Sequence, residues 1–198
     1  MNILQPPPAS LTVGRNTYEI DTDYRTWLKV NELIESIDLS VDDDETFYDN
    51  MDTVDRLQTL VFGKILDEDF LDIQNAVVTF IQGYPRQHAE GPSAASNDAG
   101  GQGYSFLHDI NYIILAIRNQ SGIDLSFNRK EPYHWWLFLL EFQTLEEHHL
   151  ISRIITYRLY EGDDPEMLKH KAYWALPEKM SNSQQRDIDE LEAMLYES

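Results

Sequence analysis

The residues best suited to chemistry are two glutamate–histidine pairs with the same spacing. Glu131 precedes His134 by three residues, and Glu146 precedes His149 by three. In di-iron carboxylate bundles, such a pair on each of two helices binds the metal with one further glutamate from each of two others. Here Glu131 precedes a proline and is expected outside the helix, while Glu146 falls in a first turn, where acids are favoured electrostatically. The first and third expected helices, after Asp21–Asp23 and after Asp67–Asp69, place no glutamate among their apolar positions, so we expect no metal site.

A second candidate is His108 beside Asp109, a combination that can act as an oriented general base. No Ser, Cys or Lys in a recognisable nucleophile context accompanies it. Asp109 lies near an expected helix start and is interpreted as a partner of the helix dipole, and His108 as a polar surface or packed side chain. Gly100–Gly103 lacks the preceding strand and the Lys-Ser/Thr ending of a phosphate loop. We therefore predict a protein that is not an enzyme and needs no cofactor.

Composition narrows the class of partner. The chain has 198 residues, 35 acidic against 15 basic, a formal net charge of −20, and no cysteine. This acidity disfavours nucleic acid and anionic membranes, and the absence of cysteine excludes disulfides and thiolate chemistry. No run approaches a membrane span, and the first residues lack the features of a signal peptide. A cytoplasmic protein is the expectation.

The elements are organised around Tyr133–Phe142, a run that is apolar on nearly every side. An amphipathic surface helix has one apolar stripe, whereas a helix apolar all round is enclosed by neighbours. Pro132 suits the first turn, where its missing N–H costs nothing. The sequence therefore predicts a buried central helix, with a core motif of His134, Trp135, Trp136 and Phe138.

Periodicity and capping residues predict the remaining elements. Leu11–Val13 and Tyr18–Ile20 alternate apolar and polar residues, which indicates a small β-hairpin. Asp42–Glu45 is expected to be a solvated loop. Helices are expected after Asp21–Asp23, over Asp52–Phe62, from Asp67–Asp69 to Gly83, from Ser105 to Gly122, from a capping box Thr144…Glu147, and from Asp164-Pro165 to Pro177. The predicted fold is mainly α, a bundle-like domain of seven or eight helices with a small N-terminal β-hairpin.

The domain organisation follows from composition. Residues 1–10, with three consecutive prolines, are expected to form an extended lead-in to a single helical domain over residues 11–178. Arg86–Gly103 is rich in Gly, Ser, Ala and Pro and is predicted to be a flexible insertion. Residues 179–198 are expected to form an acidic tail with a short amphipathic helix. Its stripe of Ile188, Leu191 and Leu195 is the candidate partner-binding surface, although docking on its own domain explains the stripe equally well.

Four stretches of the chain carry motifs that can be compared together. They are Tyr18–Leu28, Tyr104–Ile113, Gly122–Leu125 followed by His134–Phe138, and Tyr173–Pro177. In this order they resemble the bacteriophage "gene product fifteen" family, and the resemblance extends over about residues 11–178. The family brings no established catalytic residues, so none is assigned here.

The resemblance implies a tail assembly chaperone of long-tailed phages or prophages. Such a protein shields the long helical tape-measure protein in the host cytoplasm and is absent from the mature virion. Implied partners are the tape-measure protein, further copies in a homo-oligomer, and a related chaperone or a frameshifted form, with no nucleic acid or membrane. The alternatives are a structural tail component retained in the virion and a metal-dependent helical-bundle enzyme that uses the glutamate and histidine residues above.

Overall fold

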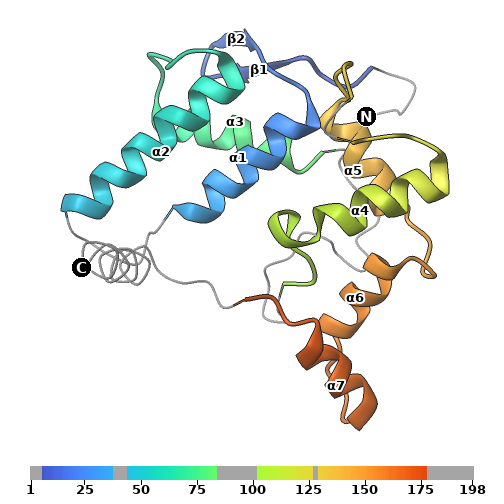
Figure 1. The fold of residues 1–198 in the computed structure, drawn as a ribbon. Coiled ribbons are helices and arrows are strands. Elements are labelled where there is room, and N and C mark those ends of the chain that lie inside the picture. Colours follow the sequence, from blue (N-terminus) through green and yellow to red (C-terminus); the bar gives the residue numbers. More distant parts are fainter. Residues whose placement is uncertain (1–5, 38–43, 84–101, 127–128, 178–198) are drawn as a thin grey trace, which may run out of the picture.

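The computed structural model describes residues 6–37, 44–83, 102–126 and 129–177. Within them the chain is mainly α, with seven helices and one two-stranded antiparallel sheet, which confirms the predicted fold class (Figure 1). The elements are β1 (Ser10–Val13), β2 (Asn16–Glu19), α1 (Tyr24–Ser36), α2 (Asp44–Phe62), α3 (Phe70–Ile81), α4 (Phe106–Ser121), α5 (Trp135–Gln143), α6 (Leu150–Arg158) and α7 (Pro165–Tyr173).

The predicted hairpin is confirmed, with a tighter turn than expected. Leu11 pairs with Tyr18 and Val13 with Asn16, so only Gly14 and Arg15 connect the strands. Gly14 has φ 58°, a left-handed conformation that suits glycine at the first central position of a two-residue turn. The Tyr18 ring packs edge-on against Phe62 of α2, which supplies the support that an isolated hairpin needs.

Most predicted helix boundaries are confirmed because short polar side chains cap them. Asp23, Asp69 and Asp164 each accept a hydrogen bond from a backbone N–H in the first turn of α1, α3 and α7. Gly122 ends α4 with φ 73°, as predicted. Ser105 is the N-cap of α4, but its side chain does not cap the helix.

Three predicted boundaries are wrong. Helix α5 begins at Trp135 with His134 as its N-cap, so Pro132 lies before the helix and not in its first turn. Helix α2 begins at Asp44 rather than Asp52, so Asp44 and Glu45 belong to a helix and not to a loop; acids are favoured in a first turn by the helix dipole. The capping box at Thr144 does not form. Thr144 is the C-cap of α5, where its hydroxyl donates to the Leu140 carbonyl, and α6 begins only at Leu150. The run of acids and histidines therefore lies in the connection between helices.

Helix α5 is buried at the centre of the core, as predicted. Trp135 is 0% exposed and Trp136 6%. Both indole N–H groups donate to carbonyls at the end of α3, Trp135 to Ile81 at 3.0 Å and Trp136 to Phe80 at 2.8 Å. These bonds satisfy the buried indoles and fix α5 against the end of α3, where the Phe80 carbonyl also accepts from the Gly83 N–H.

The elements divide into two ends joined by the central pair α4 and α5. The hairpin and α1–α3 form one end, α4 and α5 both contact α1, and α6 and α7 extend from α4 at the other end (Figure 1). The core runs through α1, α2, α3, α4 and α5, with α6 contributing Ile151.

Two predictions fall wholly or mainly outside the described residues: the insertion over residues 86–103 and the tail stripe of Ile188, Leu191 and Leu195. The end of the predicted insertion is described, and Gly103 lies against α6. A Cβ added at Gly103 would come 3.1 Å from Leu159 and 3.2 Å from Ile155. The packed part of the chain therefore resumes before Tyr104.

Candidate functional site

The segment before α1 is joined to the segment before α5 by a short antiparallel bridge. Asp23 and His134 pair across it. The Tyr24 N–H donates to the Tyr133 carbonyl at 2.8 Å, and the Trp135 N–H donates to the Thr22 carbonyl at 2.8 Å. Two motifs more than a hundred residues apart therefore meet at the N-termini of their helices.

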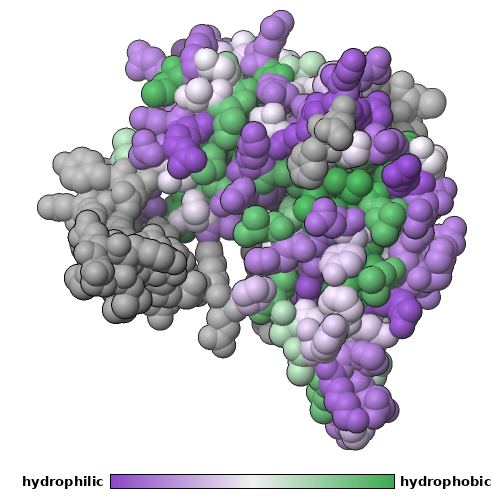
Figure 2. Space-filling model, in the orientation of Figure 1, coloured by the Kyte–Doolittle hydropathy of each residue, from purple (hydrophilic) through white to green (hydrophobic). Residues whose placement is uncertain are grey.

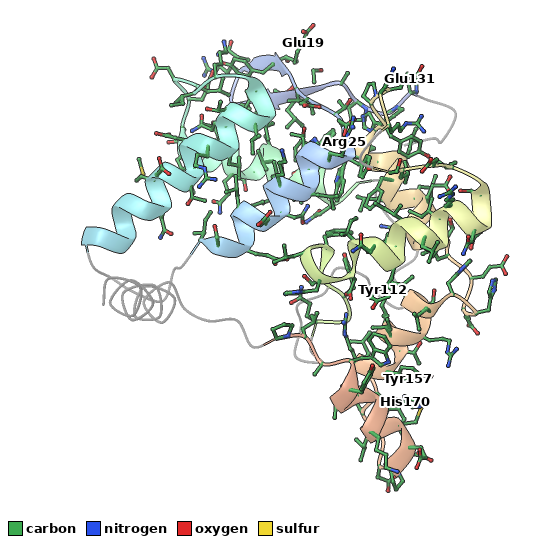
Figure 3. The ribbon with its side chains drawn as sticks, in the orientation of Figure 1. Glu19, Arg25, Tyr112, Glu131, Tyr157 and His170 are labelled. Carbon is green, nitrogen blue, oxygen red and sulfur yellow. The ribbon has the colours of Figure 1, made fainter. Side chains whose placement is uncertain are left out.

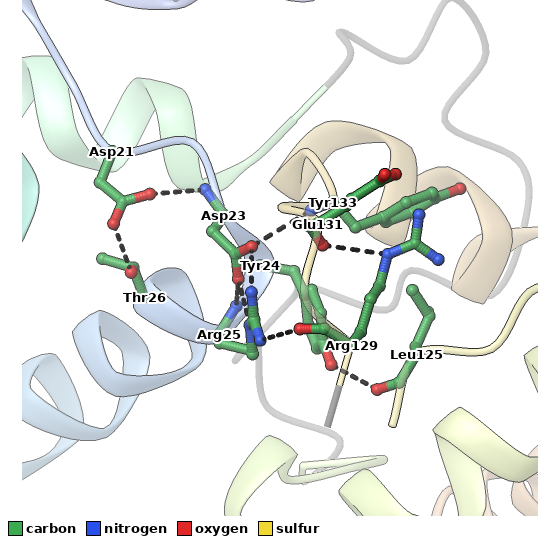
Figure 4. A network of polar contacts seen from close by, with 9 residues as sticks. All are labelled: Asp21, Asp23, Tyr24, Arg25, Thr26, Leu125, Arg129, Glu131 and Tyr133. Carbon is green, nitrogen blue, oxygen red and sulfur yellow. Dashed lines mark hydrogen bonds and ion pairs between the residues drawn. The ribbon is translucent and has the colours of Figure 1, made fainter. Parts of the chain in front are cut away.

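Side chains around Asp23 reinforce this junction (Figure 4). The Asp23 carboxylate accepts from the Arg25 guanidinium at 2.8 Å and from the Tyr133 N–H at 3.1 Å. Burial opposes ionisation of Asp23, but the hydrogen bonds from Arg25 outweigh it and hold the pKa below its usual value. Arg25 also donates to the Arg129 carbonyl, and the Tyr24 hydroxyl donates to the Leu125 carbonyl. The bonds to Tyr133, Arg129 and Leu125 therefore join the two segments, whereas the Asp23–Arg25 pair lies within the start of α1.

His134 has a structural role in the same junction. Its Nδ1 accepts from the Trp136 N–H at 3.0 Å and so caps α5, which leaves Nε2 to donate to the Pro8 carbonyl at 2.9 Å. A carbonyl only accepts and a backbone N–H only donates, so these partners select the neutral ring with its proton on Nε2. Burial lowers the pKa of His134 below its ordinary value.

The two glutamate–histidine pairs do not come together in the structure. Both ring nitrogens of His134 are bonded to the backbone, at Trp136 and Pro8, and Glu131 is exposed. At the other pair, the His149 ring nitrogen lies 3.1 Å from the Gln120 side-chain oxygen, and Glu146 pairs with exposed His148. Within the described ranges no group of three or more His, Cys, Asp or Glu side chains is arranged to hold a metal ion.

Asp109 forms a buried ion pair that the sequence did not predict. Its carboxylate accepts two hydrogen bonds from the Arg158 guanidinium of α6, at 2.5 and 3.1 Å, and both residues are at least nine-tenths buried. Arg158 also donates to the carbonyls of Trp174 at 2.6 Å and Gly103 at 3.3 Å. The interpretation of Asp109 as only a helix-dipole partner is therefore incomplete. One guanidinium joins α4, α6, the end of α7 and the segment before α4, while His108 is exposed.

Helix α4 presents an apolar surface on the side away from this ion pair. Leu107 and Leu115 are 56% and 54% exposed, and half-buried Ile110 and Ile114 lie beside them on the same helical stripe. We call these four residues the α4 face. The acid of α4, Asp109, points inward, and Arg118 is the basic residue of the helix. Figure 2 shows apolar residues gathered over α4 between hydrophilic neighbours.

A comparison with models of protein families identifies the family of this chain. Residues 7–181 match the family model described as Bacteriophage Gp15 protein. The chain belongs to this family. The match covers most of the sequence and includes every helix and strand of the described structure. No curated protein and no solved structure matches the chain.

The motifs that resemble the Gp15 family lie next to one another in the fold. The first and third contain Asp23 and His134 and meet at the bridge. The second contains Asp109 and is tied to the fourth through Arg158, which bonds to Trp174. These motifs therefore mark contacts that assemble the described fold.

Sequence reasoning missed Arg158 and the α4 face. Arg158 sits in a sequence of mixed polarity, and nothing nearby indicates its partner 49 residues away. For Leu107 and Leu115 a signal existed, because α4 has apolar residues on more than one side. Among the described residues, no helix combines the length and the apolar character that membrane crossing requires.

Proposed function

We propose that this Gp15-family protein is a tail assembly chaperone, a non-enzymatic binding protein that shields the tape-measure protein before tail-tube subunits surround it. Family membership supplies the phage context. The observation that carries the proposal is the α4 face, where Leu107 and Leu115 leave more than half of their surface exposed. Exposed apolar side chains gathered on one surface are typical of protein–protein contacts.

The chemistry of the α4 face fits a helical partner. An amphipathic helix can lay its own apolar stripe along such a seam, with anchors at helical spacing. The face has no acidic residue of its own, so burying it leaves no unpaired carboxylate. The surrounding net charge of −20 favours partners with Lys or Arg beside the stripe, and raising ionic strength should slow association more than dissociation.

Co-expression with the tape-measure protein tests this function. The wild-type chain should keep the tape-measure protein in the soluble fraction and should co-purify with it. A double variant, Leu107→Asp with Leu115→Asp, should lose both effects because it places charge on the apolar seam. The matched control is Ile65→Asp with Leu71→Asp, since these leucine-sized residues are 57% and 61% exposed elsewhere. It should behave as wild type.

The possible outcomes test the chaperone function and the role of the α4 face separately. If the wild-type chain never raises tape-measure solubility, the chaperone function is refuted. If the wild type does so and the α4 variant is equally effective, the function stands and the α4 face is not its site. Removing residues 183–198 in the same assay tests the predicted stripe of Ile188, Leu191 and Leu195. Abundant peptides of this chain in purified virions would instead favour a structural tail component.

A further inference from the structure

The described part of the chain ends at Pro177, close to helix α4. The Arg158 guanidinium, which is paired with the buried acid of α4, donates to the Trp174 carbonyl at 2.6 Å. The Trp174 ring packs edge-on against Tyr112 of α4, with ring centroids 6.0 Å apart, and Tyr112 lies on the side of α4 that faces α6 and α7 (Figure 3). These two contacts fix, beside α4, the point from which residues 178–198 continue.

The α4 face lies next to this point, and its length matches the apolar stripe predicted in segment 183–198. Tyr112 and Leu115 are neighbours on the exposed side of α4, one turn apart. The α4 face extends over about 12 Å of helix, and the stripe from Ile188 to Leu195 covers about 10 Å as a helix. Residues 178–182 span up to about 17 Å when extended, which is enough to lay the stripe along the face.

Charge distinguishes the α4 face from another exposed apolar surface, on α3. There Phe70 is 49% exposed and Leu71 61%. The start of α3 is surrounded by four acids in sequence, namely Asp67, Glu68, Asp69 and Asp72. Residues 178–198 contain six acidic and two basic residues. Because like charges repel, this acidic segment is disfavoured on α3.

On α4 the charges are arranged differently. Its single acid, Asp109, is turned inward into the buried ion pair, whereas Arg118 is exposed one turn beyond Leu115. The wider surroundings differ in the same sense. The described residues up to Gly83 carry 14 acidic and 5 basic side chains, and those from Gln102 onward carry 10 and 7. An acidic segment with an apolar stripe therefore meets less repulsion at the α4 face, where Arg118 attracts it.

We propose that segment 183–198 docks its apolar stripe on the α4 face of the same chain when no partner is bound. The segment then covers the surface at which the tape-measure protein would bind, so the two compete for it; this consequence rests on the proposed function. A tethered segment acts at an effective concentration on the order of 1 mM, which favours docking and still yields to a tighter partner. A face covered about nine-tenths of the time binds its partner about tenfold more weakly than an open face.

The chain contains no cysteine, so a single pair of introduced cysteines tests the docking in the full-length protein. Asn111 is exposed in the middle of the α4 face, and Leu191 is the centre of the stripe. A disulfide needs Cα atoms within about 7 Å, so Asn111→Cys with Leu191→Cys should cross-link within one chain under mild oxidation, seen as faster migration on a non-reducing gel. Leu71→Cys with Leu191→Cys is the control on α3. Adding Ile188→Asp and Leu195→Asp to the first pair is the matched control, and both controls should cross-link at least about tenfold more slowly.

Binding to the tape-measure protein tests the competition. Ile188→Asp with Leu195→Asp, in the chain without cysteines, should open the α4 face and raise the affinity for the tape-measure protein about tenfold. Equal cross-linking of the first pair and its controls, or a disulfide that joins two chains, would overturn the docking. Weaker binding by the aspartate variant would show that the stripe contacts the partner instead, which overturns the competition. A chain that cross-links as expected but never binds the tape-measure protein would refute the proposed function and leave the docked segment established.

Discussion

Replacing Asp109 with asparagine should leave a buried guanidinium without its counter-charge. The substitution keeps the shape of the side chain, so the wild-type contacts of α4 with α6 remain possible. The new amide nitrogen is a donor and would face the donors of Arg158, whereas the carboxylate accepts two hydrogen bonds from it. Arg158→Met removes the other partner and leaves Asp109 with the Ser105 N–H, at 2.9 Å.

The expected cost follows from burial and the number of bonds. Breaking a buried ion pair by removing one partner costs about 3–5 kcal/mol, because the remaining charge is uncompensated. Asp109→Asn should lie near the lower limit, since its amide oxygen still accepts one bond. Arg158→Met should lie near the upper limit, since the Trp174 and Gly103 carbonyls also lose their donor. The double variant Asp109→Leu with Arg158→Met buries no charge. It should cost roughly 3 kcal/mol, about 1 kcal/mol for each backbone group that loses its partner: the Trp174 and Gly103 carbonyls and the Ser105 N–H.

Urea unfolding followed by tryptophan fluorescence and by circular dichroism gives the free energy of unfolding of each of the three variants. The control is Lys169→Met, because the ion pair of Lys169 with Glu166 is exposed and should contribute less than about 1 kcal/mol. If Asp109→Asn costs less than about 1 kcal/mol, the pair is solvated and the assignment of Arg158 as the residue that joins α4, α6 and α7 is wrong. A double variant as unstable as Arg158→Met would refute the argument from unpaired charge.

The remaining predictions concern the junction and α3. Trp136→Phe should destabilise the fold by about 1 kcal/mol, because the Phe80 carbonyl at the end of α3 loses the indole donor and keeps only backbone donors such as the Gly83 N–H; unchanged urea unfolding would contradict this. His134 has a lowered folded pKa, so the unfolded chain binds the proton more readily, and stability should be constant above about pH 7 and fall as pH drops below about 6.5. His134→Asn should remove that part of the pH dependence. A variant whose stability falls with pH as the wild type's does would refute the assignment to His134. Gly83→Ala should cost more than Gly63→Ala, since both have positive φ but only at Gly83 does an added Cβ come within 2.7 Å of another side chain. Equal thermal unfolding of the two alanine variants would show that this close approach relaxes freely.

Local features of the fold could be predicted because neighbouring residues determine them. Asp23, Asp69 and Asp164 cap their helices with side chains that reach only the next turn. The central position of α5 followed from an apolar run that no surface helix would carry. The wrong helix boundaries arose where one residue type suits two different positions in a helix. Thr144 suits the start of a helix and also its end, and only the fold decides that it ends α5.

The amino-acid sequence by itself therefore determined the fold class, the hairpin, most helix boundaries and the buried tryptophan helix, since each depends on periodicity or capping within a few residues. The tertiary structure decided the partner of Arg158, the bridge between Asp23 and His134, and the exposure of Leu107 beside buried neighbours in α4. Such features depend on which distant segment covers a given surface. Burial and pairing across a hundred residues are properties of the packed chain, and no local pattern contains them.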